Sequence, residues 1–377
     1  MFLVTFISLY GGVHVYAYWR LRSAFPVGTR LMVLMAAMIA APVAIRTLEH
    51  AGFEEAARAL AWPSNIWMGS LFLFTSFLAV IDIIRLISRR IAIFSPSFRH
   101  RFSPAAACRS ALYLSIIASV YSLYEARNIR TEHLSVVTAK LPPGIQRIRI
   151  VQISDVHIGL LFRESRLERV LRAVRAASPD ILVSTGDLVD GRLSKSDDLS
   201  GLKRLSQMFV EVSAPLGKFA VAGNHEVYAG IEQAVAFTQK SGFTVLRDET
   251  VTLPNGMVII GLNDQGRRKP GKAKAAADED RLLSTAPGGF RVLLKHRPVM
   301  PEKSDGRFDL QLSGHTHKGQ LLPFYPLTWT EFSIHSGTTE TPKSSTIHVS
   351  RGSGTWGPPM RFLAPPEVTV IDLVPAK

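Results

Sequence analysis

IRIVQISDVH, residues 148–157, is a short run rich in isoleucine and valine that ends in Asp155 and His157. Such β-branched runs are typical of buried strands, whereas the residues that follow, 163–177, have the apolar spacing of a helix. Strands alternating with helices predict an α/β layered fold. Further runs of the strand type occur at 181–186, 218–223, 257–261, 290–295, 308–314 and 367–373.

Polar side chains follow five of these runs at the point where each run ends. Any one of these residues is more often a loop residue than a ligand, but five in order are a strong signal. Because ligand groups gather at the carboxyl ends of strands, we expect them to meet at one rim. Oxygen and imidazole donors without a thiolate suit Mn, Fe or Zn. The five motifs are DVH (155–157), GDLVD (186–190), GNHE (223–226), KHRP (295–298) and GHTH (314–317).

These five motifs stand in the order found in the calcineurin-like metallophosphoesterases, and the chain resembles that family over about residues 145–375. The resemblance implies a β-sandwich flanked by helices (αββα) and two divalent metal ions as cofactors. It further implies that Asp187 bridges the two ions. The remaining implied ligands are Asp155, His157 and His317 for one ion, and Asn224, His296 and His315 for the other.

The resemblance also implies catalytic roles for Asp187 and His225. Paired metals lower the pKa of a shared water and clamp the attacking and leaving oxygens. His225 is implied as the general acid for the leaving alkoxide. We expect Glu226 and Asp190 to orient these groups, with a turn before Gly191 as the alternative role of Asp190.

Lys318, in GHTHKGQ, departs from the family pattern, where many relatives have glycine. The lysine follows directly on the last predicted ligand, His317. We expect this departure to affect substrate contacts rather than the ligands.

The N-terminal third contains four apolar stretches, at 2–19, 31–48, 65–84 and 108–124. A membrane-spanning helix needs about 20 mostly apolar residues. The alternatives are buried core helices, or a cleaved signal peptide for the first stretch, which lacks a preceding basic residue and a small-residue cleavage site. We therefore predict an all-α, four-helix transmembrane region (1–125), a linker (126–146) and a metallophosphoesterase domain (147–377). With the tail RGSGTWGPPMRFLAPPE (351–367), this arrangement is similar to the membrane-bound bacterial branch of the family.

The basic residues of the N-terminal third predict both partner and orientation. Residues 1–130 contain 13 arginines, no lysine and five acidic residues, which suits anionic lipid headgroups better than nucleic acid. Arginines concentrate in the first and third connections, which predicts that these are cytoplasmic. We therefore expect an integral inner-membrane protein whose hydrolase domain is periplasmic or extracellular, although Arg127 and Arg130 argue against this orientation. The single cysteine, Cys108, excludes an internal disulfide and a thiolate cluster.

Three polar features remain outside the motifs. Asp82 and Arg85 lie one helical turn apart and are expected to pair, and His14, beside two glycines, is expected at a helix–helix contact. Residues 264–280, rich in Lys, Ala and Asp, are expected to form a solvated loop.

The favoured function is hydrolysis of a phosphomonoester, phosphodiester or pyrophosphate bond, on a membrane-associated or lipid-linked phosphorylated substrate. One alternative is cleavage of the pyrophosphate in an acylated UDP-sugar, as by a UDP-acylglucosamine pyrophosphohydrolase, which would require cytoplasmic access. Two others are a transporter regulated by the hydrolase domain and a non-catalytic scaffold, which the intact ligand set disfavours. The sequence indicates no protein partner.

Overall fold

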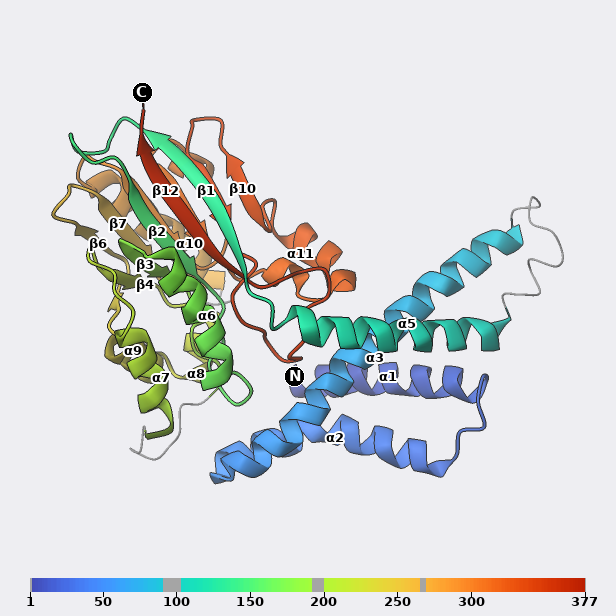
Figure 1. The fold of residues 1–377 in the computed structure, drawn as a ribbon. Coiled ribbons are helices and arrows are strands. Elements are labelled where there is room, and N and C mark those ends of the chain that lie inside the picture. The colour runs from blue at the N-terminus through green and yellow to red at the C-terminus, as the bar shows by residue number, and fades with distance from the viewer. Residues whose placement is uncertain (1, 91–102, 192–199, 265–268, 377) are drawn as a thin grey trace. The chain divides into compact units, whose positions relative to one another are not determined.

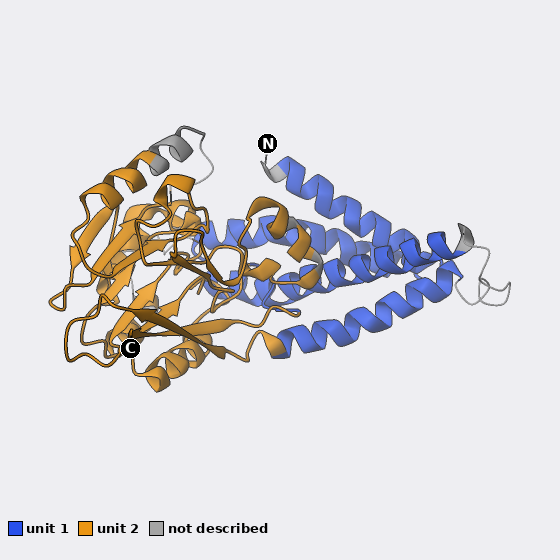
Figure 2. Cartoon of the chain, turned by 90° about the horizontal axis from the view of Figure 1, so that it is seen from above, with its two compact units in different colours: residues 1–124, 357–362 blue, residues 125–356, 363–377 orange. Residues whose placement is uncertain are grey.

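The computed structural model describes residues 2–90, 103–191, 200–264 and 269–376. The chain divides into two compact units, which Figure 2 shows in different colours. Unit 1 contains residues Met1–Tyr124 and Gly357–Phe362, and unit 2 contains Glu125–Trp356 and Leu363–Lys377.

Unit 1 consists mainly of long apolar helices. Three helices of the described part of the chain are long and apolar enough to cross a membrane, and at most 39% of the most apolar window of each is buried. Most of their apolar side chains therefore face outward, as lipid contact requires and as a core helix would not allow. Since α1 is not among these three, the predicted count of four spans stays a prediction. The helices are α1 (Phe2–Arg22), α2 (Thr29–Ala51), α3 (Glu54–Arg90) and α5 (Pro104–Glu125).

The two polar features predicted within the helices of unit 1, at Asp82 and at His14, both have polar partners. Asp82 accepts hydrogen bonds from Arg20 and, at 2.7 Å, from Arg85. The ring of His14 bonds the carbonyl of Tyr10 at 2.8 Å and accepts a hydrogen bond from Trp67 of α3 at 2.9 Å. Both predictions, an ion pair at Asp82 and a helix–helix contact at His14, are confirmed.

Unit 2 contains two mixed six-stranded sheets (Figure 1). In each sheet most strands are parallel, and antiparallel pairs join β12 to β2, β11 to β10 and β7 to β6. The first sheet has the order β1 (Arg130–Thr138), β12 (Glu367–Pro375), β2 (Ile148–Ile153), β3 (Ile181–Ser184), β4 (Lys218–Ala220) and β5 (Thr244–Val245). The second has the order β10 (Gly337–Glu340), β11 (Thr346–Val349), β9 (Leu310–Ser313), β8 (Arg291–Lys295), β7 (Val258–Leu262) and β6 (Glu249–Thr252).

The two sheets and their flanking helices form three apolar layers. Successive side chains of a strand point to opposite faces, so Ile150 of β2 joins the core shared with the second sheet, whereas Val151 packs under helices. A third cluster joins Leu282 of α10 to Ile260 of β7. This is the predicted αββα arrangement. Helices α6 (Glu164–Ala177), α7 (Ser200–Val210) and α9 (Ile231–Lys240) cover the first sheet, and α10 (Lys269–Thr285) covers the second.

Two predictions about connecting segments are wrong. Residues 130–138, inside the predicted linker, form the edge strand β1, which pairs in parallel with β12 along its whole length. One face of β1 packs Leu134 and Val136 against the core between the sheets, which a linker would leave exposed. The predicted solvated loop 264–280 is largely helix α10, because lysine and alanine are good helix formers and Leu282 and Leu283 anchor its last turns. Residues 265–268 lie outside the described residues.

Candidate metal centre

The predicted ligands lie at one rim of the sandwich, where strands of both sheets end. Asp155 and His157 follow β2, Asp187 follows β3, and Asn224 begins helix α8 (Asn224–Ala229) after β4. From the second sheet, His296 follows β8, and His315 and His317 follow β9. Gln152 of β2 donates a hydrogen bond to the carbonyl of Ser313 of β9 at 2.9 Å, which ties the two sheets together directly beneath this rim.

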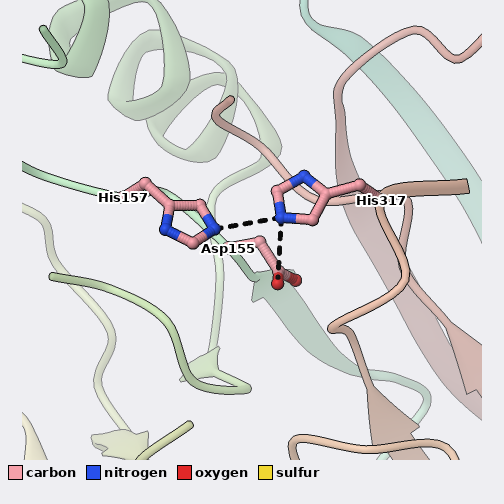
Figure 3. A group of neighbouring side chains, drawn as sticks. All are labelled: Asp155, His157 and His317. Atoms are coloured by element: carbon pink, nitrogen blue, oxygen red, sulfur yellow. Dashed lines mark hydrogen bonds and ion pairs between the residues drawn. The ribbon is translucent and has the colours of Figure 1, made fainter. Parts of the chain in front are cut away.

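The first group consists of Asp155, His157 and His317 (Figure 3). Nε2 of His157 lies 3.0 Å from Nε2 of His317, and the latter atom is 3.4 Å from Oδ1 of Asp155. All three side chains are buried. The carboxylate of Asp155 is fixed by Ser154 Oγ, which donates at 2.5 Å, and by the backbone N–H of His315. Three donor atoms therefore converge in a space that is shielded from water.

The second group is centred on Nε2 of His296. The Nδ1 atom of this ring is 2.8 Å from the carbonyl of Thr185, so Nδ1 carries a proton and Nε2 faces the site. Three further atoms surround Nε2: Asn224 Oδ1 at 3.2 Å, Asp187 Oδ2 at 3.2 Å and His315 Nδ1 at 3.1 Å.

This donor set fits a divalent cation. The atoms around Nε2 of His296, two side-chain oxygens and a second imidazole nitrogen, are all acceptors. Acceptor atoms at this distance repel one another unless a proton or a cation lies between them. Metal binding displaces such protons from its ligands. Asp187 Oδ2 is also 4.0 Å from Nε2 of His157, so it lies between the two groups, as a bridging carboxylate must. The structure thus brings together all seven predicted ligands, whose role as ligands stays a prediction.

The pKa values of the site follow from burial and from Asp187. Burial would raise the pKa of Asp187, but the charge of His296 outweighs it and holds the pKa well below its usual range. Burial would lower the pKa of His296, but Asp187 outweighs it and raises the pKa to about 10. Burial lowers the pKa of His157 to about 4, and burial together with the charge of His296 lowers that of His315 to about 2. His157 and His315 are therefore neutral at pH 7, which is the state that binds metals.

The backbone at the rim is held in unusual conformations. Left-handed φ angles are uncommon outside glycine, and they concentrate at functional sites. Close approach also requires glycine: a Cβ on Gly314 would lie 1.9 Å from Ser154 Oγ, and one on Gly223 would lie 2.2 Å from Asp187 Oδ1. Five predicted ligands have φ between 49° and 74°, namely Asp155, His157, Asp187, His315 and His317.

Glu226 and Asp190 support the ligands from behind. The buried carboxylate of Glu226 accepts hydrogen bonds from the backbone N–H groups of Asp187, Val189 and Gly223 at 2.7–3.0 Å. It thereby joins the loops that follow β3 and β4. One oxygen of Asp190 is 2.8 Å from His225 Nδ1, and the other is 3.9 Å from His157 Nδ1. Asp190 therefore orients His225 by a hydrogen bond and lies near His157, rather than serving only as a turn residue.

His225 borders the site. Its backbone N–H donates to Asp187 Oδ1 at 2.8 Å, and its largely buried ring meets that of His157 edge-on at 4.7 Å. Burial would lower the pKa of His225, but the hydrogen bond to Asp190 outweighs it, so the pKa is raised. A protonated imidazole here can act as an acid. His225 could also form a metal-binding group with His157 and Asp187, so its role stays a prediction.

Three aromatic residues of the site were not predicted from the sequence. Tyr228 and Trp356 place their rings 5.5 and 5.4 Å from the ring of His225, and Phe332 lies 5.5 Å from that of His315. Tyr228 stands one helical turn after His225, a spacing that could have identified it. Trp356 and Phe332 come from distant segments with no local signal.

A sandwich that gathers carboxylate, amide and imidazole donors of both sheets at one rim defines a metal-dependent hydrolase of phosphate esters. Residues 148–319 match the calcineurin-like phosphoesterase family, and the chain belongs to that family. It is 39% identical over 263 residues to an uncharacterized metallophosphoesterase of Aquifex aeolicus, covering 70% of this chain and 98% of that one. A relative from Bacillus subtilis is 33% identical, covering 67% and 88%. A zebrafish (Danio rerio) protein called transmembrane protein with metallophosphoesterase domain is 27% identical, covering 70% and 62%.

Proposed function

We propose that the chain uses two divalent ions to hydrolyse a phosphoester or pyrophosphate bond of a membrane-associated or lipid-linked substrate. The observation that carries this proposal is the convergence of two ligand groups on Asp187, whose Oδ2 is 3.2 Å from His296 and 4.0 Å from His157. The apolar helices of unit 1, and relatives whose names include a transmembrane protein, support the membrane part of the proposal. Mn, Fe and Zn are the ions that suit this donor set.

In the proposed reaction Asp187, Glu226 and His225 have different roles. When bound, the two ions supply a water of lowered pKa and a clamp on the phosphoryl oxygens. Asp187 offsets their charge, and Glu226 holds the backbone of Asp187 in place. His225, kept protonated by Asp190, donates a proton to the oxygen of the leaving group.

The proposal includes a location. Helix α1 would add a fourth span, and the arginines of the first and third connections would lie in the cytoplasm. Both termini, and with them the hydrolase domain, would then face the periplasm or the exterior of a bacterial inner membrane. This arrangement corresponds to a membrane-bound bacterial branch of the family.

A substrate screen tests this function. The purified full chain is supplied with manganese and given an aryl phosphomonoester, an aryl phosphodiester, a phosphatidate, a lipid pyrophosphate and an acylated UDP-sugar. We expect turnover of at least one ester or anhydride, with faster turnover of a lipid-linked member. If none is hydrolysed while two metals are bound, the proposal fails. If only an acylated UDP-sugar is cleaved, the cytoplasmic alternative replaces it.

A further inference from the structure

Five large apolar side chains are exposed in the segments that adjoin the candidate metal centre. We call them the aromatic rim: Tyr228, Leu322, Phe324, Trp329 and Trp356, all of unit 2, with exposed fractions between 40% and 60%. Single exposed apolar residues are ordinary, but a group of them at a site marks an interaction surface.

The rim is connected to the site by specific contacts. Tyr228 and Trp356 meet the ring of His225, as described above. The side chain of Gln320 accepts from the backbone N–H of Trp356 and donates to its carbonyl, both at 2.9 Å. Trp356 is therefore fixed to the segment that follows the last predicted ligand, His317.

The other rim residues belong to the 3₁₀ turn η3 (Leu322–Phe324) and helix α11 (Tyr325–Glu331). The ring of Tyr325 contacts that of His335 at 4.6 Å, and the His335 carbonyl accepts from Thr316 Oγ1 within the GHTH motif. Helix α11 is thus held to the ligand loop, while Trp329 is 60% exposed.

The composition of this segment is unusual for a water-exposed surface. Residues 321–330 read LLPFYPLTWT and contain no charged side chain. Tryptophan and tyrosine, with an apolar ring and one polar atom, are enriched where proteins meet the headgroup region of a bilayer. Residues 321–330 therefore have the chemistry of a membrane-interface segment.

The chain passes directly from the aromatic rim into a segment of the helical unit. Trp356 is the last residue of unit 2 before residues 357–362, which belong to the helical unit. Within the helical unit, Phe362 packs against Phe77 of α3 and Tyr121 of α5. Tyr121 is one turn from the end of α5, a candidate membrane span. Trp356 is therefore one peptide bond from a segment that packs against two candidate spans.

We propose that the aromatic rim docks into the headgroup region of the bilayer that holds the helices, so that lipid phosphates reach the metal centre from the membrane. This inference rests on the proposed membrane location and narrows the substrate class to phosphates carried by lipids. The other occupants of such a surface would be a soluble protein or a second copy of the chain. The experiment distinguishes contact with lipid from contact with protein.

Site-specific labelling of the full chain tests the rim. Phe324→Cys and Trp329→Cys are made separately, and each is labelled with the fluorophore NBD. The native Cys108 is buried, and labelled wild-type protein measures any background from it. Val210→Cys is the matched control, because Val210 is also exposed, and its carbonyl accepts from Lys218 at the start of β4, away from the ligand end. All proteins are placed in nanodiscs of phosphatidylcholine and phosphatidylglycerol, with and without doxyl-labelled lipid.

We expect the doxyl lipid to remove most of the emission at positions 324 and 329 and to leave that at position 210 unchanged. Equal emission with and without doxyl lipid at 324 and 329 would overturn the proposal. A blue-shifted but unquenched label would assign the rim to a protein partner, which also overturns it. Hydrolysis of the substrates of the screen described above is measured with manganese on the same nanodiscs. If wild-type protein hydrolyses none of them, the proposed function is contradicted, while the quenching still reports on the rim.

Discussion

The carboxylate of Asp187 lies between the two predicted ligand groups, whereas that of the neighbouring Asp190 does not. Oδ1 accepts the N–H of His225, and Oδ2 faces both predicted ligand groups. The carboxylate of Asp190, by contrast, bonds the ring of His225 and lies 3.9 Å from that of His157. We predict that Asp187→Asn removes nearly all activity and lowers the metal content, whereas Asp190→Asn costs about 10–100-fold, as outer carboxylates typically do. Steady-state kinetics and elemental analysis measure both effects, and equal losses would mean that the two roles are misassigned.

His225 allows chemistry to be separated from metal binding. If it is the general acid, His225→Ala should keep its metals and lose about 10²-fold or more on an alkyl phosphate, whose leaving alkoxide needs a proton. A nitrophenolate leaves without one, so hydrolysis of its ester should fall much less. The measured quantity is the ratio of the two rate losses in one variant.

Two results would contradict this role. Equal losses on both substrates with the metals retained would mean that His225 acts electrostatically on the phosphoryl oxygens. Loss of metal would place His225 among the ligands, together with His157 and Asp187.

At the scale of the elements, Glu226 joins the loops after β3 and β4. Its carboxylate accepts three backbone N–H groups in a fully buried position, including that of Asp187. In Glu226→Gln one acceptor oxygen becomes an amide donor that faces N–H groups. A buried unsatisfied group costs roughly 1–3 kcal/mol, so we predict a destabilisation of that order in urea unfolding of the metal-stripped chain.

The matched control for Glu226 is Glu232→Gln. Glu232 lies on α9 and pairs with Arg247 at an exposed position, where ion pairs contribute little. Its replacement should change the unfolding free energy by less than about 0.5 kcal/mol. Comparable destabilisation by both variants would show that the buried hydrogen bonds of Glu226 stabilise the domain no more than an exposed ion pair does.

The elements that the sequence predicted correctly are those with a strong local signal. The apolar runs of the sequence predict strands β2, β3, β4, β7, β8, β9 and β12, and five of these runs lead directly into the predicted ligands. The short strands β5, β6, β10 and β11 were not predicted. Strand β1 was missed because only Leu134 and Val136 on one face are packed in the core, so its apolar content is low. Helix α10 was missed because its first half has few apolar residues. Trp356 and Phe332 were missed because only tertiary packing brings them to His225 and His315.

The whole molecule combines a helical unit with a hydrolase domain, and its orientation remains a prediction from the arginine distribution. A reporter fused after Lys377 should be active if it functions only in the periplasm, and silent if it functions only in the cytosol. Fusions after Gly28 and Gly52, in the first and second connections, should give the cytosolic and periplasmic signals respectively. The reverse pattern would place the hydrolase domain in the cytoplasm and would favour an acylated UDP-sugar as substrate.

The metal content tests the central claim most directly, because every proposed step depends on the ligand groups around Asp187. The full chain is purified, stripped with a chelator and reloaded with manganese, and bound metal and nitrophenyl phosphate hydrolysis are measured together. We predict that chelation abolishes hydrolysis, that manganese restores it, and that two ions bind per chain. Full activity in metal-stripped protein would contradict the proposed two-metal mechanism.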